Sequence, residues 1–151
     1  MSEHHASVRW TRTSPDFKYK TYNRAHAVTF KGGAIVLPGS AAPKFLGDAD
    51  RVDPEEAFVA SLSACHMLTF LAICARKRLT VETYEDDAIG YLEKGENGKL
   101  WIARVALQPR IQFAPQAAVD AKLLGEIHHL SHEECFIANS VKTDVSVAPQ
   151  S

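Results

Sequence analysis

The sequence predicts an α+β domain in which two helices pack on an antiparallel sheet. One long stretch, from Ala57 to Ala75, contains no charged residue and follows a strong helix-start signal. Five other runs have the alternating or β-branched composition of strands, and a further segment has apolar residues at helical spacing. The resulting order is β, β, α, β, β, α, β, which favours a single sheet covered by a long buried central helix and a second helix.

The first two strands are expected over residues 5–12 and 26–37. The second of these runs contains Gly32-Gly33, which indicates a turn or a bulge inside it. Segment 38–52 is rich in proline and glycine, so we expect a loop that leads into the long helix.

The start of the long helix is well marked. Asp53 fits the N-cap, Pro54 fits the first helical position, and the acidic Glu55 and Glu56 suit the positive end of the helix dipole. Glu56 also completes a capping box with Asp53. We expect the helix to end near Arg78, where basic residues suit its negative end.

The rest of the chain supplies a hairpin, a helix and a last strand. Residues 80–93 and 99–112 are expected to be two strands joined by the turn Gly-Glu-Asn-Gly-Lys. A second helix is expected to begin near Pro115, because the apolar residues after it share one helical face, and a closing strand is expected over 138–148.

Size and charge limit the classes of function. The 151 residues fit one domain, residues 1–151, with a core of its own. A formal net charge of −1 without a basic block argues against a nucleic-acid partner and against an anionic membrane surface. No apolar signal segment is visible, and three cysteines fit a reduced setting, so we expect a cytoplasmic protein.

The uncharged stretch 57–75 is close to the length that spans a bilayer. It contains polar side chains such as Ser63 and His66, and the sequence has no second stretch like it. A buried central helix therefore explains it, and we reject a membrane span. One small domain covers such a helix poorly, so we expect a second subunit to wrap it.

The cysteines are the candidate reactive groups, although a free cysteine usually only packs. Cys65 and Cys74 lie nine residues apart on the long helix and face opposite directions, so Cys74 is expected in the core. Cys65 is too far from the helix N-terminus to be activated by the dipole and needs a cation. The adjacent His66 points about 100° away, which favours a packing or interface role. Cys135 lies in a polar segment, where we expect it to be the more accessible cysteine.

Histidines offer a different interpretation. His128, His129 and His132 have the helical spacing of metal ligands, and Cys135 follows three residues later. A zinc site is possible on this pattern, but its remaining ligands would have to be carboxylates, and a solvated histidine-rich helix end explains the pattern as well. A non-redox protein that binds a metal or a small molecule through these histidines is therefore the alternative function.

Two segments resemble the OsmC/Ohr family of thiol-dependent peroxidases, named for osmotically inducible protein C and organic hydroperoxide resistance protein. They are DPEEAFVASLSACHMLTFLA at 53–72 and ECFIANSVKTDVSV at 134–147. The family pattern has a cysteine ten residues after the first glutamate of the helix start and a second cysteine near the last strand. These positions correspond to Glu55, Cys65 and Cys135, and the early arginine of the family is best matched by Arg24 in YNRAHAVTF.

The resemblance implies an OsmC-like intertwined homodimer with two sites at its interface. It implies that Cys65 is the peroxidatic thiolate, which attacks a hydroperoxide and becomes a sulfenic acid. Cys135 then condenses with Cys65 to a disulfide, which an external dithiol, of the lipoyl type in the family, reduces. Arg24 is implied to stabilise the thiolate and orient the peroxide, and Glu55 to hold the arginine. No cofactor and no metal belong to this interpretation.

The position of Glu55 leaves two arrangements open. Glu55 lies ten residues, or about 15 Å, before Cys65 on one helix, so it does not reach the sulfur of its own chain. Either it contacts a long arginine that spans the gap, or it serves the site of the other subunit. A plain alternative is that Glu55 only complements the helix dipole.

Overall fold

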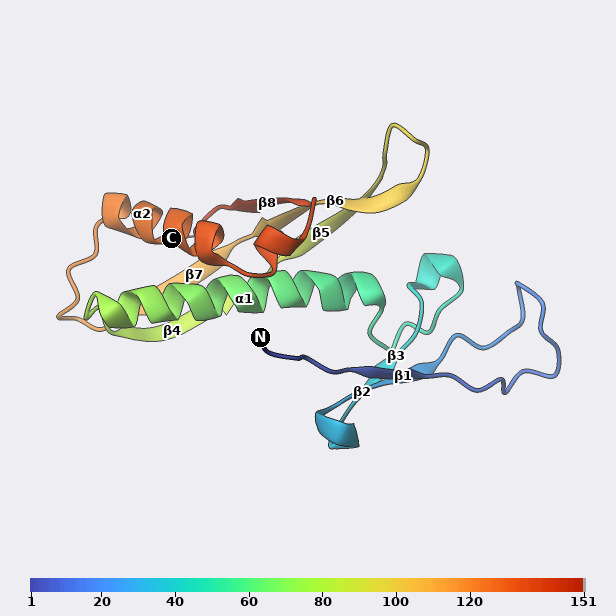
Figure 1. Cartoon of the computed structure of the whole chain (residues 1–151). Coiled ribbons are helices and arrows are strands. Elements are labelled where there is room, and N and C mark those ends of the chain that lie inside the picture. Colours follow the sequence, from blue (N-terminus) through green and yellow to red (C-terminus); the bar gives the residue numbers. More distant parts are fainter. Residues whose placement is uncertain (151) are drawn as a thin grey trace. The chain divides into compact units, whose positions relative to one another are not determined.

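The computed structural model describes residues 1–150 and has the α+β architecture that the sequence predicts (Figure 1). Its contacts divide it into two units, Met1–Ala57 and a second unit that begins at Phe58, which are described in turn. The helices are α1 (Pro54–Arg76) and α2 (Ala121–Glu134). The strands are β1 (Ser7–Arg9), β2 (His26–Phe30), β3 (Ile35–Gly39), β4 (Val81–Asp86), β5 (Ile89–Lys94), β6 (Leu100–Leu107), β7 (Pro109–Phe113) and β8 (Asp144–Val147).

The first unit contains an antiparallel sheet in the order β1-β2-β3. The expected turn at Gly32-Gly33 is confirmed: both glycines have positive φ angles, 66° and 96°, a conformation that favours glycine. The run 26–37 is therefore the hairpin β2–β3. The strand expected over 5–12 is shorter and covers only Ser7–Arg9.

The capping box at the start of α1 is also confirmed. The backbone N–H of Glu56 donates to Asp53 Oδ1 at 2.8 Å, and the N–H of Asp53 donates to Glu56 Oε2 at 3.1 Å. Two N–H groups are satisfied in this way, and Pro54 occupies the first helical position. This cap fixes where α1 begins, and with it the position of Glu55.

The other end of α1 comes two residues earlier than expected. Arg78 has a φ of 60°, its N–H donates to the carbonyl of Ala75, and the N–H of Leu79 donates to the carbonyl of Cys74. These bonds form a Schellman motif, here with arginine in the position that glycine usually takes. The helix thus ends at Arg76 and the chain turns directly into β4.

In the second unit, the two long strands expected over 80–93 and 99–112 are each broken into two. Strand β4 pairs with β7, and β5 pairs with β6 in a hairpin closed by the predicted turn. One contact between distant residues accompanies the break: the Asp86 carboxylate accepts the N–H of Gln108 at 2.6 Å in place of a strand partner, and Pro109 has no N–H to donate.

The C-terminal part differs from the sequence expectation in three respects. Helix α2 begins at Ala121 rather than near Pro115, with Asp120 as an N-cap whose carboxylate accepts the N–H of Leu123 at 2.8 Å. The last strand is confined to β8, because residues 138–140 form a 3₁₀ turn. Strand β8 pairs with β6 in parallel, which makes this sheet mixed; the crossover through α2 allows the parallel direction.

One face of α1 supplies most of the core of the second unit. Phe70, Ile73 and Cys74 pack with Ile127 of α2, and Leu62 packs with residues of β6. Figure 1 shows α2 running alongside α1, as these contacts require.

The opposite face of α1 is open. Leu68 is 62% exposed, and only 28% of the most apolar window of the helix is buried. By length and composition alone α1 could cross a membrane, with a mean hydropathy of 1.9, but its inward face is a protein core. The cover that we expect for the outward face, a second subunit, remains a prediction.

A polar pair lies within this core. His66 of α1 and His128 of α2 are both buried, and His66 Nε2 lies 3.0 Å from His128 Nδ1. The rings are within 8° of parallel, and their centroids are 5.4 Å apart. Both nitrogens therefore lie nearly on the line between the centroids, so the shared proton lies in the plane of both rings. The expected packing role of His66 is confirmed.

This pair makes stability depend on pH. Burial is the main cause that lowers the pKa of His66 to about 4, with repulsion from His128 and His132 added and Asp86 opposing. Burial also lowers the pKa of His128 to about 4. Histidines of the unfolded chain titrate near 6.5. As pH falls, the histidines of the unfolded chain bind protons first. The stability of the fold due to this pair is therefore highest above about pH 6.5 and is lost as pH falls from about 6.5 to 4.

We expect the free energy of unfolding to fall by at least about 3 kcal/mol more between pH 7 and pH 4 in the natural chain than in a His66→Leu/His128→Leu variant. Replacing both rings together leaves no unpaired buried partner. Urea unfolding at several pH values measures the difference, and His129→Leu, at an exposed position, is the control that keeps the natural slope. The same slope in the double variant and the natural chain would exclude the pair as its source.

Candidate active site

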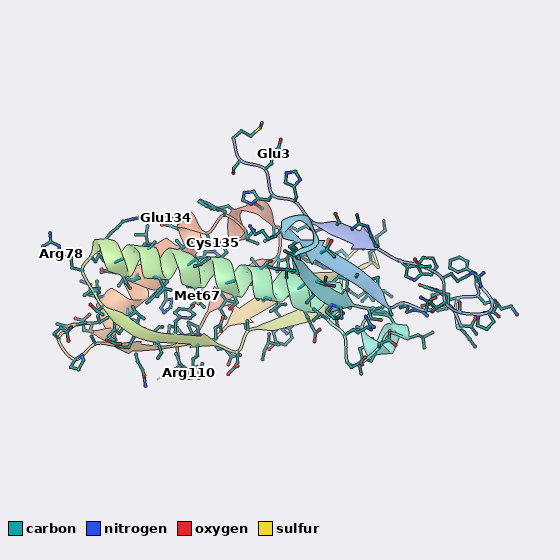
Figure 2. The ribbon with its side chains drawn as sticks, turned by 90° about the horizontal axis from the view of Figure 1, so that it is seen from below. Glu3, Met67, Arg78, Arg110, Glu134 and Cys135 are labelled. Atoms are coloured by element: carbon teal, nitrogen blue, oxygen red, sulfur yellow. The ribbon has the colours of Figure 1, made fainter. Side chains whose placement is uncertain are left out.

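The structure brings Cys65 and Cys135 together. Cys65 lies on α1, and Cys135 is the C-cap of α2, so the packing of the two helices brings the cysteines to one place. Both are free thiols, and the Cys65 side chain is near enough to Cys135 to contribute to the shift of the Cys135 pKa. Figure 2 shows Cys135 beside α1.

The two thiols have unequal environments. Cys135 is 1% exposed, and burial raises its pKa to about 11, assisted by the neighbouring Cys65 side chain and opposed by the backbone N–H of Ala138, 3.4 Å from Sγ. Cys135 thus keeps its proton at neutral pH.

The expectation that Cys135 is the more accessible cysteine is wrong. Cys65 is partly exposed, whereas Cys135 is buried. The polar character of the segment comes from its neighbours: Glu133 and Glu134 are exposed, and Phe136 is 81% exposed. Because Cys135 caps the helix, its side chain turns inward while those around it turn to solvent. The polarity of a short sequence segment therefore does not show which of its side chains turns inward.

The third cysteine belongs to the core, as its helical position predicts. Cys74 packs with Phe70, Ile73 and Ile127. Burial raises its pKa to about 11, with Lys77 opposing. A protonated, enclosed thiol is a poor nucleophile.

Arg24 and Glu55 line one pocket of about 510 Å³ in the first unit. Arg24 is buried: its Nη1 donates to the carbonyl of Tyr22 at 3.0 Å, its Nη2 donates to that of Tyr19 at 2.6 Å, and its guanidinium lies 4.0 Å from the centre of the Tyr22 ring. These two bonds use two of five N–H donors and leave the rest for another ligand. Within residues 1–150 no ion pair joins Arg24 to Glu55.

The sequence analysis did not identify the aromatic wall of this pocket. Trp10, Phe17 and Tyr22 contact one another, with ring centroids 5.3–6.5 Å apart. Asn23 holds the loop: its carbonyl accepts the Trp10 indole N–H at 2.7 Å, and its side chain accepts the N–H of Thr13 at 2.8 Å. The available signal was the density of aromatic residues between positions 10 and 22. These aromatic rings give Arg24 apolar surroundings, where the lower dielectric strengthens the electrostatic interactions of its charge.

The three histidines of the alternative interpretation do not converge. His128 is taken up by the pair with His66, whereas His129 is exposed and lies 3.4 Å from Glu133. The facing nitrogens of His66 and His128 point directly at each other, so a metal ion does not fit between them. Within residues 1–150, no group of three or more His, Cys, Asp or Glu side chains is arranged to hold a metal ion.

Comparison with known proteins is consistent with this geometry. The sequence model of the OsmC-like protein family matches residues 47–150. An OsmC-like protein of unknown function from Vibrio cholerae O1 biovar eltor is 45% identical, with a TM-score of 0.94 over 99% of this chain and 100% of that one. An organic hydroperoxide resistance protein from Legionella pneumophila and OhrB of Bacillus subtilis share the fold at 18% identity. Their TM-scores are 0.75 and 0.72, over 100% and 99% of this chain and 98% of each of theirs. No curated protein sequence matches the chain.

The unequal burial of the cysteines predicts selective alkylation. Iodoacetamide at neutral pH should modify Cys65 roughly 10-fold or more faster than Cys135 or Cys74, because Cys65 is partly exposed whereas the other two are buried thiols with a raised pKa. Peptide mass spectrometry over a time course gives the three rates. Faster modification of Cys135 would contradict the described environments.

Proposed function

Because the chain belongs to the OsmC-like protein family, we propose that it is a thiol-dependent peroxidase that reduces organic hydroperoxides. The observation that carries the proposal is the neighbouring pair of one partly exposed and one buried cysteine. Two proteins of the same fold are named organic hydroperoxide resistance proteins, which supports this substrate class.

The chemistry proceeds in two steps. The Cys65 sulfur attacks the terminal oxygen of the hydroperoxide, the O–O bond breaks, and the organic oxygen takes a proton and leaves as an alcohol. Cys65 is then a sulfenic acid. The Cys135 sulfur attacks the Cys65 sulfur, and its thiol proton passes to the departing hydroxyl, which leaves as water. A Cys65–Cys135 disulfide remains.

Arg24 is the proposed cation of the site. A thiolate in the middle of α1 has little help from the helix dipole, and the guanidinium can hold both the sulfur and a peroxide oxygen. We propose that Glu55, which lines the same pocket as Arg24, orients it during the reaction. Whether both residues serve Cys65 of their own chain or of a partner subunit is the choice that the helical spacing of Glu55 and Cys65 leaves open.

The assembly that we propose is a homodimer. The open apolar face of α1, which includes Leu68, needs cover that one chain does not provide. An external dithiol returns the disulfide to two thiols, and a cytoplasmic location would supply such reductants. No cofactor or metal takes part in either step.

We expect Cys65→Ser to abolish reduction of cumene hydroperoxide, since the hydroxyl is not ionised and does not replace the sulfur as nucleophile. Cys74→Ala should keep turnover within about twofold, because Cys74 is enclosed in the core. Peroxide consumption with an excess of dithiothreitol measures both variants, and circular dichroism checks that each is folded. Equal loss of activity in the two folded variants would remove Cys65 from its assigned role.

A second prediction concerns Arg24. Arg24→Ala should lower the rate of Cys65 alkylation at pH 7 by roughly 10-fold or more, because an opposite charge nearby favours the thiolate. Arg24→Lys should restore the charge but only part of the peroxidase rate, since lysine lacks the planar fork of donors. Arg9→Ala, on the exposed strand β1, is the matched control. If Arg24→Ala alkylates at the natural rate, the cation must be another residue, and an effect of Arg9→Ala would identify it.

A further inference from the structure

We propose that the external reductant enters the catalytic cycle at Cys65, so that its thiolate attacks Sγ of Cys65 in the Cys65–Cys135 disulfide and expels Cys135. This inference rests on the proposed function, because it concerns the disulfide that the peroxidase reaction would form. It assigns the two cysteines different tasks in the reductive half of the cycle, just as the proposed peroxidase reaction does in the oxidative half.

Access to the two sulfurs is the first argument. A thiolate attacks a disulfide through a mixed-disulfide intermediate, and access to the attacked sulfur limits the rate. Cys135 is 1% exposed, and its Sγ is enclosed by the Cys65 side chain and by the turn that carries Ala138. A reductant could reach Cys135 only if the chain at the end of α2 opened.

Cys65, unlike Cys135, is accessible to solvent. It is partly exposed, and the residues one turn away on α1, Ser61 and Thr69, are not buried. The hydroperoxide must reach this same sulfur for the first step of the proposed reaction. The route that admits the oxidant therefore also admits a thiol reductant, and no second opening is needed.

The pKa of the leaving group, Cys135, argues against this direction of attack, because a thiol with a high pKa leaves slowly. The pKa of Cys135 is raised to about 11 in the reduced protein, chiefly by burial. The backbone N–H of Ala138, 3.4 Å from the sulfur, opposes this shift. It is in place to hold the negative charge of Cys135 as it departs. Departure of Cys135 thus needs no movement of the chain, whereas attack on Cys135 does.

The step balances with a dithiol as the named reductant. Its first thiolate forms a bond to Cys65 Sγ while the S–S bond to Cys135 breaks, and Cys135 leaves as a thiolate that takes up a proton. The second thiol of the reductant then attacks its own first sulfur and releases Cys65. The reductant is oxidised to a cyclic disulfide, and both protein cysteines are reduced.

A monothiol exposes the intermediate, because it has no second sulfur with which to complete the reaction. The Cys74→Ala chain is oxidised with diamide, which forms the disulfide without any peroxide, and is then mixed with excess glutathione. Aliquots are quenched in acid at short times, free thiols are capped with N-ethylmaleimide, and the peptides are mapped by mass spectrometry. Extrapolation to zero time removes later exchange between the two cysteines.

We expect glutathione on Cys65 and maleimide on Cys135, at a ratio of roughly 10 to 1 or more at zero time. Glutathione mainly on Cys135, or equally on both cysteines, would overturn the proposal. If diamide forms no Cys65–Cys135 disulfide, the inference and the proposed function both fail. If the adduct lies on Cys65 but the chain does not reduce hydroperoxides, only the proposed function fails.

Discussion

Burial of one face of α1 against α2 and β6 is the constraint on which the second unit depends. The face that carries Leu62, Phe70 and Cys74 forms the core, so Cys65 lies at its edge rather than within it. The same packing places the end of α2, and with it Cys135, against α1. Core packing thereby determines which cysteine faces solvent and which is enclosed.

This arrangement gives two identical side chains different chemistry. Cys135 is buried and protonated at neutral pH, and Cys65 is partly exposed. In the proposed cycle the exposed sulfur meets both the oxidant and the reductant, and the buried sulfur reacts only with its neighbour. An enclosed second thiol limits side reactions, since a sulfenic acid formed on Cys65 meets Cys135 before any other thiol.

Local signals in the sequence predicted the features that short segments determine. The Asp53–Glu56 capping box, the Gly32-Gly33 turn and the core position of Cys74 follow from neighbouring residues or helical spacing alone. The break of the long strands depends on Asp86 meeting Gln108, and the burial of Cys135 depends on α1, so no local pattern contains them. The aromatic pocket around Arg24 likewise combines residues from positions 10 to 55, which only the folded chain brings together.

The most direct test of the central claim is the fate of the three thiols when the reduced protein meets one equivalent of cumene hydroperoxide. The account predicts that two thiols are lost for each peroxide reduced, and that peptide mapping finds Cys65 linked to Cys135 while Cys74 remains free. Reduction of the peroxide with Cys135 still a free thiol, or a disulfide that includes Cys74, would contradict it.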